Sequence, residues 1–295
     1  MRIGIGLPAA VPGADMTTLG QWAADAERAG FDAVGVFDRL VYDNLEPLIA
    51  LAAAAARTRR VELVTTVLDV GWRNNPVLLA KQLASVEQVS GGRLTAGLGL
   101  GGWPEDYAAS QAPQSGMAAL WQSYLATMRA VWAGTTSGQG GPTTKLPDGR
   151  PALLLGGLVA AAHQRAARHG QGWVSPLFGL PVLQQGAAAV HAAWQQAGRS
   201  GRPRILTGRY FSLGDHADAI ADEYMRHYYG EEYFPAARAD TVTTPERLLS
   251  ELGALQAAGA TDVILYPCSA GLEQIDLLAD TLHAAGFLYA RNSRS

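Results

Sequence analysis

The chain contains a single cysteine, Cys268, which excludes an internal disulfide framework and indicates a reducing compartment. Long hydrophobic runs are missing too: the longest alanine-rich stretch, residues 48–56, leads into an arginine-rich segment at 57–60 and cannot span a bilayer. The first eight residues are too short and too glycine-rich for a signal peptide. We therefore expect a cytoplasmic protein without a membrane partner.

Neither a nucleic-acid surface nor a metal site is indicated. The 23 Lys and Arg residues face 26 Asp and Glu residues, and the net charge of −3 gives no general attraction to nucleic acid. The six histidines show no His-Glu-x-x-His spacing and there is no cysteine pair, so no metal site is predicted. A Gly-x-Ser-x-Gly elbow is also absent, which disfavours a serine hydrolase.

Short β-rich segments alternate with alanine-rich helical segments along the whole chain. Strands each followed by a helix are typical of the (β/α)8 TIM barrel, an α/β fold, and 295 residues suit one such domain over residues 1–295. A doubly wound open sheet would give the same alternation. The predicted strands cover residues 2–7, 33–37, 61–66, 94–98, 152–155, 172–174, 204–211 and 262–266. The predicted helices cover residues 19–29, 47–58, 77–89, 118–132, 160–168, 180–197, 245–258 and 272–285.

Two segments interrupt this rhythm. Residues 134–151 are rich in Gly, Thr and Pro and predict a mobile connector. Residues 216–244 carry several charges and the aromatic residues Tyr224, Tyr228, Tyr229, Tyr233 and Phe234. We expect this second segment to form an extra helical excursion after the seventh strand, lying over the site.

The most glycine-dense stretch, residues 90–103, contains a strand and the loop that follows it. Glycines such as Gly99 and Gly101 allow a backbone to approach a ligand closely, and loops at the carboxyl ends of parallel strands carry the chemistry of α/β folds. The spacing lacks the P-loop lysine and is not the dinucleotide fingerprint. A tight turn of the barrel would explain it equally well.

A second glycine pair, Gly156 and Gly157, opens directly into a predicted helix. Free N–H groups at the helix start could meet an anion or a carbonyl-rich ring, although a plain strand-to-helix turn is equally compatible with the pattern.

Polar residues near two other strand ends are candidates for a site at the same end of the barrel. Asp38 and Arg39 place a carboxylate beside a guanidinium, which could orient a ring, bind an anion or tune a proton donor, whereas a structural ion pair is the alternative. Tyr42 follows closely. His216, after the seventh strand, is a further site-facing candidate, with a surface position as its alternative.

Several motifs in a fixed order extend over nearly the whole chain. They read Ala-Glu-Arg-Ala-Gly-Phe-Asp-Ala-Val (26–34), Leu-Ala-Lys-Gln (79–82) running into Ser-Gly-Gly-Arg-Leu (90–94), Leu-Gly-Gly (155–157) with Gly-Trp (172–173), and Thr-Pro-Glu-Arg (244–247) before Gly-Ala-Thr-Asp-Val (259–263). In combination they resemble the bacterial luciferase-like family of flavin- or deazaflavin (F420)-dependent oxidoreductases.

The resemblance implies a barrel that binds a flavin-type tricyclic ring at the carboxyl ends of its strands, beside a non-proline cis peptide near Thr66–Val67. The implied cofactor-binding residues are Leu7, Thr66, Val67, Gly99, Gly101, Tyr107, Gly156, Gly157 and Ser175. The expected substrate pocket is lined by Pro8, Tyr42, Trp103 and His216. Asp38 and Arg39 are the expected catalytic pair.

Arg39 departs from the family pattern. Many relatives carry a histidine after the acidic residue at the end of the second strand, whereas an arginine stays charged and cannot shuttle protons near neutral pH. Either no residue of this chain performs the role of that histidine, or a residue elsewhere in the chain performs it. Arg39 is instead expected to hold an anionic substrate or the anionic tail of the cofactor.

The resemblance predicts an F420-dependent oxidoreductase that transfers a hydride to or from a small organic substrate. An FMN-dependent monooxygenase using reduced flavin and O2, supplied by a separate reductase, is the first alternative. A non-catalytic flavin-binding barrel is the second. A homodimer or higher homo-oligomer is expected by analogy with the family.

Overall fold

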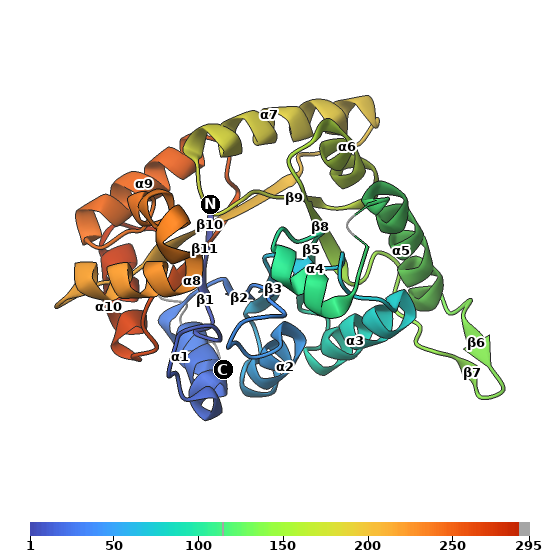
Figure 1. Ribbon diagram of the computed structural model, residues 1–295, viewed down its shortest axis with the longest axis horizontal. Coiled ribbons are helices and arrows are strands. Elements are labelled where there is room, and N and C mark those ends of the chain that lie inside the picture. Colours follow the sequence, from blue (N-terminus) through green and yellow to red (C-terminus); the bar gives the residue numbers. More distant parts are fainter. Residues whose placement is uncertain (114, 289–295) are drawn as a thin grey trace.

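Eight parallel strands close into a barrel in the computed structural model, which describes residues 1–113 and 115–288 (Figure 1). The ring closes where β3 pairs with β5 through Leu63–Leu94 and Val64–Thr95. The barrel strands are β1 (Arg2–Gly6), β2 (Ala33–Val36), β3 (Glu62–Thr65), β5 (Leu94–Gly99), β8 (Ala152–Gly156), β9 (Gly172–Val174), β10 (Arg204–Phe211) and β11 (Asp262–Pro267). This closure confirms the predicted (β/α)8 barrel over a doubly wound sheet.

Helices form an outer ring around the strands (Figure 1). Their starts follow local chemistry: Pro47, Pro76 and Pro245 occupy first-turn positions, where a missing N–H costs nothing. Gly30 ends the first helix at φ 98°, as its sequence position predicts. The ring consists of α1 (Leu19–Ala29), α2 (Pro47–Arg57), α3 (Pro76–Val89), α5 (Met117–Trp132), α6 (Ala160–His169), α7 (Leu180–Gln196), α9 (Pro245–Ala257) and α10 (Glu273–Ala284). None of the helices in the described ranges combines the length and hydropathy that a bilayer span requires.

Several short elements supplement this pattern. The predicted excursion after the seventh strand is confirmed as α8 (Ala217–Ala239), which bends at Gly230 (φ 68°). Its two ends are fixed beside each other, because Val242 donates to the Tyr210 carbonyl oxygen and accepts from the Ser212 N–H, both at 2.9 Å. The sequence did not predict η1 (Met16–Thr18), β4 (Leu68–Asp69), α4 (Pro104–Ser110) or the outward hairpin of β6 (Ser137–Gly138) and β7 (Gly141–Pro142) (Figure 1).

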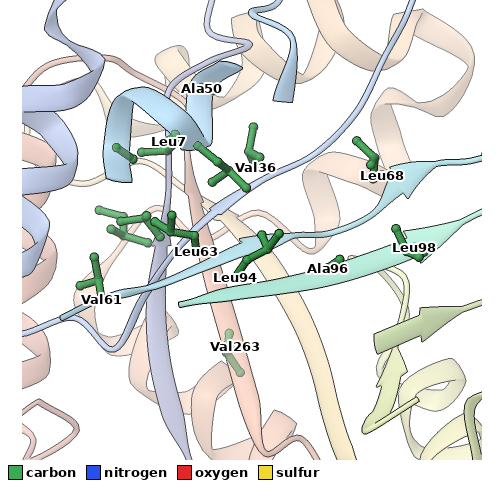
Figure 2. Close-up of a cluster of buried hydrophobic side chains, with 14 of the residues drawn as sticks. Leu7, Val36, Ala50, Val61, Leu63, Leu68, Leu94, Ala96, Leu98 and Val263 are labelled. Carbon is green, nitrogen blue, oxygen red and sulfur yellow. The ribbon is translucent and has the colours of Figure 1, made fainter. Parts of the chain in front are cut away.

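The barrel wall is apolar on both of its faces. Figure 2 shows Val36, Leu63 and Leu94, from three neighbouring strands, gathered in one buried cluster together with Ala50 of α2. Each of these side chains is at most 2% exposed. Strands covered by helices outside and by packed side chains inside read as continuous apolar runs, which is why the sequence located them well.

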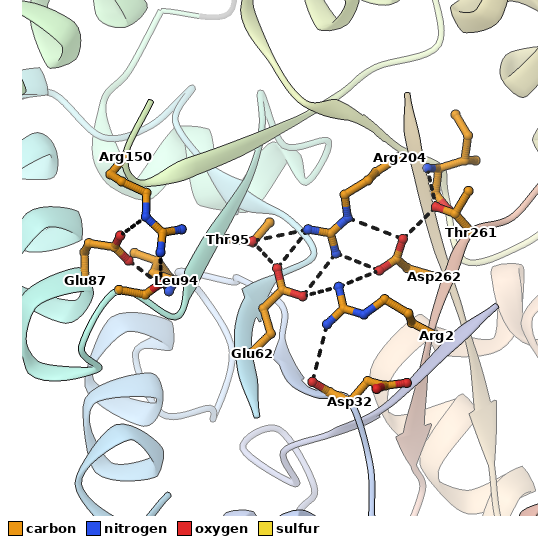
Figure 3. Close-up of polar contacts among 12 residues, drawn as sticks. Arg2, Asp32, Glu62, Glu87, Leu94, Thr95, Arg150, Arg204, Thr261 and Asp262 are labelled. Carbon is orange, nitrogen blue, oxygen red and sulfur yellow. Dashed lines mark hydrogen bonds and ion pairs between the residues drawn. The ribbon is translucent and has the colours of Figure 1, made fainter. Parts of the chain in front are cut away.

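An ionic network closes the end of the barrel where the strands begin (Figure 3). Arg204 donates to Glu62 Oε1 at 2.8 Å and to Asp262 Oδ1 at 2.6 Å, and Arg2 contacts Glu62 Oε2 at 2.5 Å. These residues come from the starts of β10, β3, β11 and β1. The network therefore ties four strands together and leaves the opposite end of the barrel for a ligand.

Acidification should weaken this network. Burial alone would raise the pKa of Glu62, but hydrogen bonds and the charge of Arg204 hold it below its ordinary value of 4.5. The stabilisation is therefore complete above about pH 4.5 and is lost as the pH falls through the lowered pKa. We expect thermal unfolding of Glu62→Gln to depend less on pH between 3 and 6 than that of the parent. Parallel pH profiles would contradict a role for Glu62 in acid sensitivity.

Candidate active site

A cavity of about 680 Å³ lies at the carboxyl ends of the strands. Its volume falls in the range of small-molecule and cofactor sites, and most of its lining is apolar or aromatic. The lining residues are Phe37, Asp38, Thr66, Val67, Asp69, 99–103, Trp121, 156–159, Ala161, Ala162, Arg165, 174–178, Tyr210, Tyr228 and Tyr229.

Most of the predicted site residues meet in this cavity. The ones that line it are Asp38, Thr66, Val67, Gly99, Gly101, Trp103, Gly156, Gly157 and Ser175. They come from five different strand ends, those of β2, β3, β5, β8 and β9, so the barrel brings together residues that lie more than 130 positions apart. Their individual roles stay predictions.

The remaining predicted site residues do not line the cavity. Leu7 belongs to the buried apolar core and Pro8 follows it, also buried. Tyr107 lies behind the glycine loop, where its hydroxyl donates to the Leu100 carbonyl oxygen. His216 is exposed at the start of α8, with φ 60°. These four residues follow strand ends as expected, but they are not among the residues that line the cavity.

The bottom of the cavity is formed by Thr66 and Val67, which are joined by a non-proline cis peptide as the resemblance predicts. The Thr66 hydroxyl contacts the Tyr266 hydroxyl. Val67 occupies space left by two glycines: a Cβ on Gly99 would lie 2.6 Å from Val67 Cγ2, and one on Gly156 would lie 3.4 Å from Val67 Cγ1. These glycines therefore serve the packing of the cavity floor.

Asp38 is held in place from one side. Its Oδ2 accepts from the Asp69 N–H at 3.0 Å and from Arg73 at 2.9 Å. Its Oδ1 is buried without a hydrogen-bond partner in the part of the chain that the structure describes. Burial raises the pKa of Asp38, and Arg73 offsets this only in part. Asp38 therefore presents an unpaired oxygen beside the cavity.

Arg39 is engaged by protein groups. Its side chain is 3% exposed, pairs with Asp106 at 3.1 Å and Glu105 at 2.7 Å, and lies over the Trp103 ring at 3.9 Å. Asp106 also accepts from the Leu40 and Val41 N–H groups. The ion-pair alternative thus describes Arg39 better than the expected anion site, because its charge is already balanced by two carboxylates.

An aromatic cover lies over the cavity: the expected excursion supplies Tyr228 and Tyr229, whereas sequence reasoning missed its partners Phe37 and Phe178. Tyr228 and Tyr229 of α8 pack edge-on at 4.7 Å between ring centroids, and Tyr228 lies 5.3 Å from Phe37. Phe178 lies 5.3 Å from Tyr229. Tyr42, an expected pocket residue, packs behind Tyr228 at 4.8 Å and does not line the cavity. The tyrosines of residues 216–244 are the sequence signal from which the excursion over the site was expected.

Hydrogen-bond donors collect on the side of the cavity formed by β8 and β9. Gly157 has φ 121°, and a Cβ there would lie 2.7 Å from the Ala162 Cβ, so the turn into α6 itself requires glycine. No side chain caps the start of α6, and Arg165 of the same helix lines the cavity. The Ser175 hydroxyl, also at the cavity, is buried without a protein partner among the described residues. This side can receive an anionic or carbonyl-rich group.

Comparison with known proteins agrees with this geometry. The profile of the luciferase-like monooxygenase family matches residues 1–267. An uncharacterized protein of Mycobacterium tuberculosis is 27% identical over 175 residues, which cover 55% of this chain and 61% of the relative. An F420-dependent glucose-6-phosphate dehydrogenase of Beutenbergia cavernae is 30% identical over 196 residues, covering 55% of this chain and 56% of the relative. The chain thus spans less than two thirds of the length of these curated relatives.

Solved structures share the fold at low identity. Monooxygenase RslO1 from Streptomyces bottropensis superposes with a TM-score of 0.79 at 22% identity, covering 97% of this chain and 100% of its own. An F420-dependent secondary alcohol dehydrogenase superposes with the same TM-score at 18% identity, covering 96% and 98%. The family profile matches residues 1–267, and the barrel and its cavity agree with that match. The chain therefore belongs to the luciferase-like monooxygenase family, a family of oxidoreductases.

Proposed function

We propose that this protein is an F420-dependent oxidoreductase that exchanges a hydride with a small organic substrate. The observation that carries the proposal is one cavity with an apolar floor, an aromatic cover and a side rich in hydrogen-bond donors. The F420-dependent names among its relatives support the choice of cofactor.

The residues present fit a tricyclic ring with an anionic tail. Val67 offers the ring an apolar surface, and the unpartnered Ser175 hydroxyl and Asp38 Oδ1 offer hydrogen bonds to its polar edges. The uncapped start of α6 and Arg165 suit a phosphate. When bound, a reduced deazaflavin supplies the hydride chemistry, and the protein positions the substrate and excludes water. Tyr228 and Tyr229 would provide that exclusion.

An FMN-dependent monooxygenase is the second candidate. The family description and the likeness to a monooxygenase favour it, since the same cavity accepts either ring. This alternative would require reduced flavin from a separate reductase. For both candidate functions we propose that the protein is cytoplasmic and forms a homo-oligomer.

Equilibrium titration of the purified protein with F420 and with FMN, followed by cofactor fluorescence in parallel experiments, tests the proposal. We expect saturable binding of F420 with an affinity at least tenfold higher than that for FMN. Tighter binding of FMN would favour the monooxygenase, with O2-dependent product formation as its confirmation. Binding of neither cofactor would contradict both functions and favour a barrel without redox activity.

Ser175→Ala should weaken cofactor binding roughly twofold to tenfold, the worth of about one net hydrogen bond. Its melting temperature should stay unchanged, because the described structure gives the Ser175 hydroxyl no protein partner to lose. Ser212→Ala is a matched control: its hydroxyl is also buried and unpartnered among the described residues, but it does not line the cavity. Equal affinities in the two variants would remove Ser175 from the cofactor site.

A further inference from the structure

Asp69 is a buried carboxyl group that borders the cavity without a hydrogen-bond partner. It is the last residue of β4, lies opposite Gly99 of β5, and is 5% exposed. Gly101 leaves room for it, because a Cβ there would lie 2.9 Å from Asp69 Cγ and Oδ2. No N–H or O–H group of the described residues donates to its carboxyl oxygens, although the Asp69 N–H itself donates to Asp38.

The cations nearby are already committed to other carboxylates. Arg73 pairs with Asp38 at 2.9 Å and with Glu46 at 3.1 Å. Arg39 pairs with Glu105 and Asp106, as described above. Two guanidinium groups thus contact four carboxylates, and Asp69 is a fifth acid that neither of them contacts.

The groups that face Asp69 disfavour its ionised form. Burial, followed by the negative charges of Asp38 and Asp106, raises the pKa of Asp69 well above its ordinary value, and Arg73 and Arg39 offset this only in part. The hydroxyls of Tyr107 and Tyr228 are the other titratable groups that interact with it, and burial raises the pKa of both. A carboxyl group in its neutral form is an O–H donor, and Asp69 lines the cavity in which such a donor would act.

We propose that Asp69 is the proton donor of this active site, taking the function that Arg39 cannot perform. This inference rests on the proposed hydride transfer and adds its direction, because a neutral acid serves reduction of the substrate. As a substrate carbon in a C=O or C=C bond gains a hydride from the reduced cofactor, the electron pair of that bond moves to the neighbouring atom. That atom takes the proton of Asp69. The cofactor is oxidised by two electrons, and the Asp69 carboxylate regains a proton from water after product release.

The protonation state of Asp69 can be measured without any cofactor. We expect the infrared spectrum of the protein alone to show the carbonyl band of a protonated carboxylic acid at pH 7. The band should disappear in Asp69→Asn, persist in Glu105→Gln, and titrate at lower pH in Asp38→Asn, which removes a neighbouring negative charge. A band that disappears in Asp38→Asn and persists in Asp69→Asn would place the proton on Asp38. Identical spectra for Asp69→Asn and the parent would show Asp69 ionised, and either result would overturn the proposal whatever the cofactor is.

Kinetics separate proton donation from a structural role. Asp69→Asn has nearly the shape of the neutral acid and removes a source of repulsion, so its melting temperature should equal or exceed that of the parent. Its affinity for cofactor should change less than threefold, whereas kcat for substrate reduction should fall about 10²- to 10⁴-fold, the usual range for loss of a general acid. The alkaline fall of the kcat profile should also vanish. An unchanged kcat and pH profile would overturn the assignment even if cofactor binding is confirmed.

Discussion

Gly97→Ala should destabilise the barrel severely. A Cβ on Gly97 would lie 2.0 Å from the Thr65 carbonyl oxygen, and that contact is with backbone, which cannot rotate away. The Thr65 hydroxyl also donates to the Gly97 carbonyl oxygen at 2.7 Å, so the two strands are held together at this point. Forced separation of β3 from β5 should cost at least the roughly 1–3 kcal/mol typical of overpacked cores. Thermal unfolding measured by circular dichroism checks this.

Gly102→Ala is the matched control within the same glycine-rich stretch. A Cβ at Gly102 would meet nothing within 4 Å, and its backbone φ lies outside the region that favours glycine. We expect its melting temperature to stay within about 2 °C of the parent, since surface substitutions are usually within 0.5 kcal/mol. Equal stability of the Gly97 and Gly102 variants would show that β3 can move away from β5 at little cost.

Arg39→Ala should lower the free energy of unfolding by about 3–5 kcal/mol, because it leaves the carboxylate of Asp106 buried without its cation. The side chain of Asp106 is 1% exposed, so water cannot replace the lost partner. The melting temperature should fall by roughly 10 °C for a chain of this size. Loss of the Arg39 stack on Trp103 should also loosen one wall of the cavity.

Glu105→Ala provides the comparison for Arg39. Glu105 contacts the same guanidinium, but its side chain is 46% exposed, and such a partner contributes at most about 1 kcal/mol. A small effect at Glu105 and a large one at Arg39 would identify the buried pair as the source of stability. If Arg39→Ala keeps its stability and instead loses affinity for anions in a salt-dependent way, the original expectation of an anion site would be correct.

The sequence predicted the barrel well because its signals are local. Apolar segments alternate with helices that begin at Pro47, Pro76 and Pro245, and each signal depends on a few neighbouring residues. The order of motifs then located the strand ends correctly. Thr66–Val67 and Ser175 are found at the cavity for the same reason, since a strand end in a parallel barrel always faces the same side.

The chemistry at those strand ends depends on partners that are distant in the sequence. The charge of Arg39 is balanced by Asp106, 67 positions away. Because of this pairing, Arg39 belongs to a buried ion pair and not to the anion-binding site that the sequence led us to expect. The sequence gives no signal for Asp69, because a single acidic residue after a strand forms no pattern. That the nearby guanidinium groups pair with other carboxylates is visible only in three dimensions. The resemblance implies a cofactor contact for Tyr107, whereas in the structure its hydroxyl donates to the Leu100 carbonyl oxygen and it is not among the residues that line the cavity.

The excursion between β10 and α9 is a segment whose sequence can change without changing the barrel wall. Its ends are joined by the two hydrogen bonds of Val242, so residues 213–241 leave and re-enter the wall at one point. Insertions or substitutions within α8 can therefore alter the cover of the cavity while the strand register below stays intact. Proteins that share this barrel wall can therefore differ in the ligands that enter the cavity through changes in this one segment.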